Sequence, residues 1–244
     1  MDGPTPSRLQ HDRATVLGEE RSGELVIRKM IDVMRLRDPD LADHAQRTAE
    51  IATAIGAQMD CSLETLDRLY SAGQLHDIGK LGISEAILWK PTSLSRSEWR
   101  VIRSHPEEGH RLVADCVHRE IAAAVLYHHE RMDGDGYPFG IDGHTLPLTV
   151  RVVQVADAFD AMTSERPYQA ALSAAVAVAE IRRCSGAQFD PDVVDALARL
   201  FRDRDPDEPV TRAGRPGRAP IDDGIDVFDP PAGPAVVRLR DRRA

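Results

Sequence analysis

The sequence predicts an all-α fold, a helical bundle in the middle of the chain, and three observations support it. Apolar residues recur at helical spacing, no segment alternates apolar and polar residues over a useful strand length, and residues that cap helix N-termini precede several periodic stretches. At 244 residues the chain is long enough to bury a self-sufficient core. We therefore expect one domain over residues 23–202.

The two flanks do not share this pattern. Residues 1–22 are polar, with Gly and Pro and no sustained period, and residues 203–244 are rich in Pro, Gly, Arg and Asp with few apolar side chains. Segments of this composition bury too little apolar surface to balance the entropy of ordering them. We expect a flexible N-terminal arm and a disordered C-terminal tail.

The first well-marked helix places a histidine on its buried face. Asp38 and Pro39 fit an N-cap followed by proline at the first helical position. In the helix that follows, His44 shares one face with Ile51 and Ile55. A lone buried histidine is more often bonded to a carbonyl than to a metal, so His44 alone is weak support for a metal site.

The following helices lead to further candidate ligands. The apolar stripe over residues 66–75 runs directly into His76 and Asp77, and the stripe over residues 121–125 is continued at i+7 and i+8 by His128 and His129. Between them Ser95 and Glu98 fit a capping box. Gly79 follows the first stripe and is expected at a helix end.

The last part of the domain contains acids where apolar residues are expected. The segment LTVRVVQVADAFDAMTS is apolar nearly all round, yet it carries Asp157 and Asp160. Asp190 and Pro191 mark one more helix start. A buried carboxylate without a partner costs several kcal/mol, so both acids of the apolar segment need cations or hydrogen-bond donors.

Histidines and aspartates on buried faces share one explanation, a metal centre. Cysteine is absent from the set, which disfavours a thiolate zinc site and favours iron or manganese, with zinc still allowed. The set has more ligands than one ion needs. The sequence therefore predicts two divalent metal ions, with Asp77 able to bridge them.

The overall charge and the cysteines restrict the class of protein. A net charge of −9 argues against a non-specific binder of DNA, RNA or anionic membranes, which would carry a basic surplus. Cys61, Cys116 and Cys184 form no CxxC pattern and fit reduced thiols in the cytoplasm. No apolar run approaches the roughly 18 residues of a membrane span, so we expect a soluble, cytoplasmic protein.

Three stretches together resemble a known family. HDIGKLGISEAILWKPTSLSRSEWRVIRSHPEEG, HHERMDGDGYPFGIDGHTLPL and VADAFDAMTSERPY are similar to the HD-GYP branch of the HD phosphohydrolase superfamily. HDxGK alone indicates the superfamily, and HHE-x-x-DG-x-GYP downstream indicates the branch. The resemblance covers about residues 30–197. It implies a helical bundle with two or three metals that hydrolyses cyclic di-GMP to pGpG or GMP.

The resemblance also implies roles for individual residues. Lys80 would face the scissile phosphate, Gly136, Tyr137 and Pro138 would lie over the substrate, and Arg166 would contact a phosphate. It implies metal ligation at seven positions: His44, His76, Asp77, His105, His128, His129 and Asp157. Hydrolysis would use a hydroxide that bridges the two metals. Catalysis is thus assigned to Asp77 and Lys80.

Two positions depart from the family pattern. Trinuclear members have a glutamate one helical turn before the first histidine, and here the shorter Asp40 occupies that position. Asp40 is therefore only a tentative ligand for a third metal. Gln169 stands where active relatives often have a basic residue, which should weaken phosphate binding. Outside the ligand set, Asp160 either orients a ligand or is a structural acid, and Glu130 of the HHE motif could simply order the loop.

Three functions remain open. The leading hypothesis is a cyclic di-GMP phosphodiesterase in bacterial second-messenger signalling. The second is an HD hydrolase of another cyclic dinucleotide or nucleotide, which Gln169 keeps open. The third is a module without catalysis that binds cyclic di-GMP or a partner protein through the GYP loop. A diguanylate cyclase or another signalling protein is the candidate protein partner.

Overall fold

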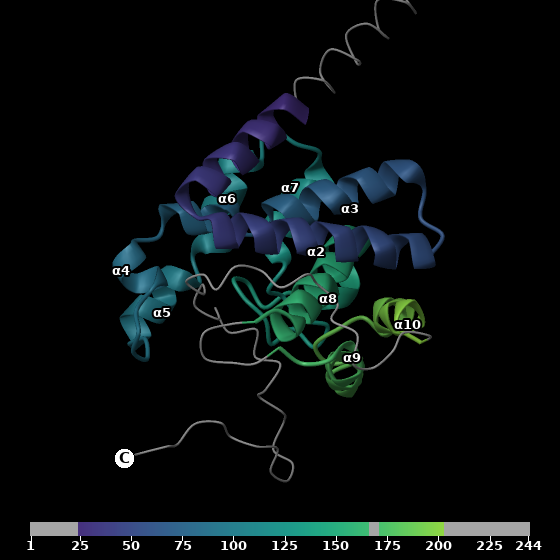
Figure 1. Cartoon of the computed structure of the whole chain (residues 1–244). Helices are drawn as coiled ribbons and strands as arrows, with labels where there is room; N and C mark the ends of the chain where they lie inside the picture. Colours follow the sequence, from purple (N-terminus) through teal and green to yellow (C-terminus); the bar gives the residue numbers. More distant parts are fainter. Residues whose placement is uncertain (1–23, 166–170, 203–244) are drawn as a thin grey trace, which may run out of the picture.

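The computed structural model describes residues 24–165 and 171–202, and within them the chain is helical (Figure 1). No strand forms among the described residues, where two isolated bridges, Arg131 with Asp142 and Ser185 with Phe189, are the sole β pairings. The predicted all-α fold is confirmed. The predicted arm, residues 1–22, and tail, residues 203–244, lie outside the described part.

Residues 24–37 form a first helix. The elements that follow it are, in chain order, α2 (Pro39–Gln58), α3 (Leu63–Leu75), η1 (Ile78–Gly82), α4 (Glu85–Leu88), α5 (Arg96–Ile102), α6 (His105–Val113), α7 (Arg119–Tyr127), η2 (Gly143–Thr145), α8 (Leu148–Thr163), α9 (Ala174–Arg183) and α10 (Pro191–Leu200).

The helix starts that the sequence marks are confirmed. The Asp38 side chain accepts a hydrogen bond from the Leu41 backbone N–H at 3.0 Å, which caps α2. Asp190 caps α10 in the same way. At the start of α5, Ser95 and Glu98 form the expected reciprocal capping box. These caps satisfy N–H groups that have no partner within their own helices.

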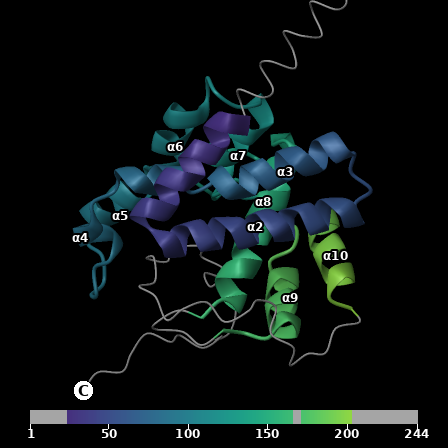
Figure 2. The same ribbon diagram turned by 45° about the horizontal axis from the view of Figure 1, so that its top comes forward.

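The centre of the bundle is α8. Figures 1 and 2 show α2 and α3 side by side with α8 crossing behind them, and α8 also contacts α7, α9 and α10. Because neighbours surround it, α8 is buried on nearly every side. This position explains why its sequence is apolar all round, and it places the acids of α8 in the interior.

A smaller apolar cluster lies to one side. The short helices α4 and α5 project from the bundle at the left of Figure 1, where Ile83, Leu88 and Ile102 are buried with two tryptophans packed against them. Among the described residues, no helix combines the length and the apolar character needed to cross a bilayer.

The expectation for Gly79 was wrong. The helix α3 ends four residues earlier, at Leu75, and Gly79 lies inside η1. A Cβ atom at Gly79 would lie 2.0 Å from the backbone oxygen of His105 and 2.5 Å from the backbone nitrogen of Gly109. Glycine is therefore needed because η1 and α6 approach each other here. This contact brings the HD segment beside His105.

Candidate metal centre

Three of the candidate ligands lie within three residues of a helix end and are oriented by that helix. His76 is the C-cap of α3, His128 is the C-cap of α7, and His105 follows α5 by three residues. Each ring bonds through Nδ1 to the carbonyl three residues earlier: His76 to Gly73 at 2.7 Å, His105 to Ile102 at 2.8 Å and His128 to Val125 at 3.0 Å. The last helical turns thus hold these rings in place.

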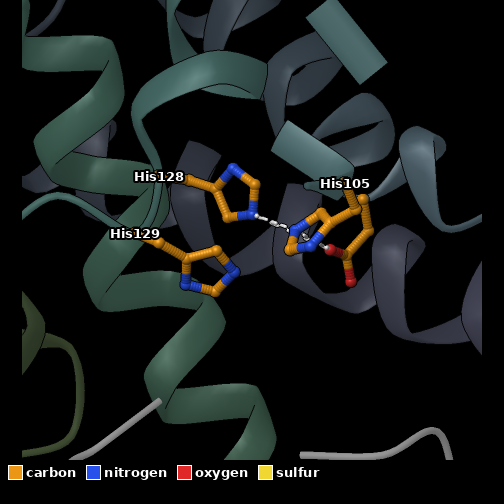
Figure 3. Close-up of side chains that lie close together, drawn as sticks. His105, His128 and His129 are labelled. Atoms are coloured by element: carbon orange, nitrogen blue, oxygen red, sulfur yellow. Dashed lines mark hydrogen bonds and ion pairs between the residues drawn. The ribbon is translucent and has the colours of Figure 1, made fainter. Parts of the chain in front are cut away.

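This bonding determines which ring nitrogen can bind a metal. A carbonyl oxygen only accepts hydrogen bonds, so in a neutral ring Nδ1 carries the proton and Nε2 carries the lone pair. Partners of this kind fix the tautomer of metal-binding histidines and increase their basicity. Figure 3 shows His105, His128 and His129 gathered around a common point, with Nε2 of His105 and His128 3.1 Å apart.

His44 is oriented by side chains instead of a carbonyl. Its Nδ1 lies 2.7 Å from Oδ2 of Asp160, a residue of α8 with no exposed surface. Arg47 donates to both oxygens of Asp160, from Nε at 2.7 Å and from Nη2 at 3.0 Å. Asp160 therefore orients a candidate ligand, as one of its two expected roles required. Arg47 in turn holds Asp160.

Asp77 lies between the two sides of the cluster, and its two oxygens face different histidines. Oδ2 lies 3.7 Å from Nε2 of His44 and 3.4 Å from Nε2 of His76. Oδ1 lies 3.3 Å from Nε2 of His105 and 3.7 Å from Nε2 of His128. A carboxylate with one oxygen toward each set of imidazoles has the arrangement of a bridging ligand.

The donor atoms form two groups that share Asp77. The first group is His44, His76 and Asp77, the second is Asp77, His105, His128 and His129, and within each group the donor atoms lie within 4.8 Å of one another. Among the described residues, Nε2 of buried His76 has no hydrogen-bond partner. Buried imidazole and carboxylate donors without cysteine fit iron, manganese or zinc. The residues present therefore fit the predicted metals.

Asp157 extends the first group. From α8, its Oδ1 lies 3.1 Å from Nε2 of His44 and 3.7 Å from Nε2 of His76. All seven residues that the family resemblance assigns as metal ligands therefore lie in one cluster. Asp40, on α2, belongs to neither group of donors. A third metal bound through Asp40 remains a prediction.

The pKa values of His44 and His128, one from each group, are shifted in opposite directions. Burial lowers the pKa of His44, but hydrogen bonds to Asp157 and Asp160 outweigh this and raise it to about 9. Burial and the nearby His129 and His105 lower the pKa of His128 to about 3. Burial alone would raise the pKa of Asp77, yet Lys80 and His76 hold it well below its ordinary value. The shared carboxylate is thus ionised.

The GYP loop is fixed to the cluster by its own backbone and by one glutamate. Glu130 accepts hydrogen bonds from the backbone N–H groups of Phe139 at 2.8 Å and Ile141 at 2.9 Å, so it orders the loop, which is the role that the sequence suggested for it. A Cβ at Gly136 would lie 2.4 Å from the Cα of Glu130. Glycine is therefore required there because the loop packs closely against the backbone of Glu130.

The remaining predicted residues have varied surroundings. Tyr137 stacks on His129, with ring centroids 4.6 Å apart and planes at 17°, and its peptide bond to Pro138 is cis. Lys80 is buried and donates to Oδ2 of Asp77 at 2.7 Å. Arg166 and Gln169 lie outside the described residues.

Sequence reasoning missed two arginines. Arg47 follows His44 by three residues and therefore shares its face of α2, so this spacing was an available signal. Arg103 lies with its Cζ 4.9 Å from the ring centroid of Tyr137. The sequence carries no comparable signal for Arg103, because it and Tyr137 are far apart in the chain.

The fold and this cluster define a helical-bundle protein with a histidine and aspartate centre suited to two metal ions. The chain belongs to the HD domain family, which matches residues 28–193. Among solved structures, it resembles the HDG"Y"P protein Bd1817 from Bdellovibrio bacteriovorus, with a TM-score of 0.57 and 17% identity over 75% of this chain and 62% of the other. At this identity the likeness concerns the fold.

Two curated relatives are more similar in sequence. The cyclic di-GMP phosphodiesterase response regulator RpfG of Xanthomonas campestris is 38% identical over 74% of this chain and 48% of its own length. The 3'3'-cGAMP-specific phosphodiesterase 3 of Vibrio cholerae is 34% identical over 73% of this chain and 39% of its own length. The chain thus spans about half the length of these relatives or less. The HD-GYP resemblance is confirmed.

Proposed function

We propose that this chain is a metal-dependent phosphodiesterase that hydrolyses cyclic di-GMP to pGpG or GMP. The observation that carries the proposal is the position of Asp77, whose two oxygens face separate sets of histidines. This arrangement suits two neighbouring metal ions that act on one phosphodiester. The relatives named as cyclic di-GMP phosphodiesterases, RpfG among them, support the substrate class.

The residues of the chain prepare this centre for hydrolysis. Two metal ions held by the two groups of donors would lower the pKa of a bound water and neutralise charge on the phosphoryl group. Asp77 and Asp157 hold negative charge toward the ions, while the Nε2 atoms of the histidines supply neutral donors. Because the cluster is buried, its charges act in a medium that screens them less than water does. Asp160 keeps His44 in one orientation.

Other residues bind the substrate in this proposal. Lys80, beside Asp77, faces the scissile phosphate, and its charge stabilises negative charge that develops on the phosphoryl oxygens. Gly136, Tyr137 and Pro138 form the loop over the dinucleotide. Arg166 supplies a second cation.

The donor set also bears on the metal and the compartment. Imidazole and carboxylate donors favour iron or manganese, with zinc as the alternative. Asp40 is the proposed ligand of a third ion. Cys61 and Cys116 are free thiols, which supports the cytoplasm as the proposed location.

A second candidate substrate is 3'3'-cGAMP. The relatives of Vibrio cholerae that carry the name 3'3'-cGAMP-specific phosphodiesterase support it. Active relatives often have a basic residue at the position of Gln169, and its replacement by glutamine also fits a changed preference among cyclic dinucleotides. A third reading is a signalling module that binds a cyclic dinucleotide or a diguanylate cyclase without cleaving the dinucleotide.

The test is a comparison of substrates with protein purified without oxygen and loaded with iron or manganese. Cyclic di-GMP, 3'3'-cGAMP and cyclic di-AMP are each incubated with the protein, and products are separated by chromatography. We expect fastest turnover of cyclic di-GMP, giving pGpG or GMP. Faster turnover of 3'3'-cGAMP would select the second candidate, and binding without turnover of any dinucleotide would select the third.

A further inference from the structure

A three-layer stack connects the surface to the metal centre. The ring of Tyr137 lies on the ring of His129, with centroids 4.6 Å apart. The Cζ atom of Arg103 lies 4.9 Å from the centroid of the same tyrosine. The ring of one loop residue thus separates a guanidinium from a candidate metal ligand. Arg103 belongs to a different part of the chain from the other two.

The position of Arg103 is fixed by the backbone. Arg103 is the C-cap of α5, and its N–H group bonds to the carbonyl of Trp99. The next turn of chain leads to His105, whose ring bonds back to the carbonyl of Ile102. The segment that orients one candidate ligand therefore also carries the guanidinium.

The charge of Arg103 is available to a ligand. The residue is exposed, and within residues 24–165 and 171–202 no carboxylate forms an ion pair with it. By contrast Arg47 is engaged with Asp160. An arginine that rests its face on an aromatic ring keeps its N–H donors, which point outward in the guanidinium plane. Those donors match two oxygens of a phosphate.

The substrate class requires such a cation. A cyclic dinucleotide carries two phosphates, and two metal ions engage the one that is cleaved. The second phosphate also carries a negative charge, and the chain around it has a net charge of −9. A local cation is therefore needed to hold it.

We propose that Arg103 is a substrate-binding residue that holds the second, uncleaved phosphate of the cyclic dinucleotide while its face rests on Tyr137. This inference depends on the proposed function and names a contact within it. Arg103 selects for ligands with two phosphates, because a ligand with one phosphate at the metals gains nothing from it.

The test compares Arg103→Met with a matched control, Arg100→Met. Arg100 is an exposed arginine on α5, one turn earlier, and its substitution makes the same change in charge. KM and kcat are measured for cyclic di-GMP and for bis(p-nitrophenyl) phosphate, which has a single phosphate. Metal content per chain is measured in the same samples.

For Arg103→Met we expect KM for cyclic di-GMP to rise about tenfold, the size of a lost charged hydrogen bond. The change in kcat should be much smaller, and KM for the single-phosphate substrate should rise far less. As the salt concentration increases, KM should rise more steeply for wild type than for the variant, because salt screens the charge of Arg103. Arg103→Lys keeps the charge but loses the paired N–H donors of the guanidinium, so its KM for cyclic di-GMP should lie between those of wild type and Arg103→Met.

Other results overturn the inference. Equal KM values for Arg103→Met and Arg100→Met would show that the guanidinium does not contact substrate. Equal losses on both substrates, or loss of metal, would show that Arg103 acts by supporting His129 through Tyr137. Metal-loaded wild-type protein that cleaves no cyclic dinucleotide would overturn the proposed function as well, so the two failures are distinguishable.

Discussion

The two groups of candidate metal ligands differ in how His44 on one side, and His105 and His128 on the other, are oriented. In the group of His76 and His44, the His44 ring is oriented by Asp160, which Arg47 holds in turn. In the group of His105 and His128, both rings are oriented by backbone carbonyls. A backbone carbonyl remains when a side chain is substituted, whereas the ion pair of Asp160 and Arg47 can be removed by one substitution. A single substitution outside the ligand set can therefore disturb the geometry of the first group.

His44 and His128, one from each group, also differ in charge. Aspartates raise the pKa of His44 to about 9, whereas burial and neighbouring histidines lower the pKa of His128 to about 3. Without metal, His44 thus retains a proton at neutral pH and His128 does not. Metal binding at the first group must displace that proton, because a metal needs the Nε2 lone pair.

The largest effect should follow from removal of one ligand from either group. We expect His44→Ala and His129→Ala each to lower metal content by about one ion per chain. Each should reduce hydrolysis of cyclic di-GMP on the order of 10³-fold, since several kcal/mol of stabilisation by one ion is lost. Elemental analysis and chromatographic assays check both. Two ions retained in either variant would remove that residue from the ligand set.

A smaller effect should distinguish the two kinds of support. Arg47→Met removes the partner of Asp160 but no candidate ligand. We expect metal affinity at the first group to fall about 10- to 100-fold, as for other outer partners of metal ligands, with little change at the second group. Titration of metal-free protein with manganese measures both sites. Arg47→Lys should recover part of the affinity, because it retains one donor and the charge. Equal weakening at both sites would contradict separate support.

The smallest effect concerns the stability of metal-free protein at alkaline pH. The pKa of folded His44 is about 9, above its ordinary 6.5. Its contribution to stability is therefore complete below pH 6.5 and is lost as pH rises toward 9. We expect the free energy of unfolding in chelator to fall over this range by on the order of 3 kcal/mol at most. The measured sign of this loss is a lower thermal unfolding temperature at higher pH. His44→Gln should flatten this slope. An unchanged slope in the variant would contradict the charged pair.

The acid side of the same measurement tests the second group. The pKa of folded His128 is about 3, below its ordinary value of 6.5. Its neutral state favours the fold above pH 6.5, and this contribution is lost as pH falls toward 3. Depressed pKa values of Asp77 and Asp160 act in the same direction. Metal-free protein should therefore be most stable near pH 6.5.

Much of the fold could be predicted because its signals are local. The caps at Asp38 and Asp190 and the box at Ser95 depend on residues within one turn, so the sequence displays them directly. Gly79 was misread because its reason is a contact with His105, a residue from another helix. Contacts between distant segments leave no periodic signal.

The site divides in the same way. The apolar stripes alone indicated nearly all of the candidate ligands, and the family motifs added His105. The pairing of Arg47 with Asp160 joins α2 to α8, and that of Arg103 with Tyr137 joins α5 to the GYP loop. Neither pairing follows from spacing along the chain. The candidate ligands could be named from the sequence, whereas the residues that orient them could be found only in the structure.

The most direct test of two metal positions that share one carboxylate is the metal content of Asp77→Ala beside that of wild type. Both proteins are purified without oxygen, loaded with manganese and analysed for metal per chain, with folding checked by circular dichroism. We predict about two ions per chain in wild type, and less than one in the variant because both groups lose a ligand. A folded variant that keeps one ion at full affinity would contradict the shared role of Asp77.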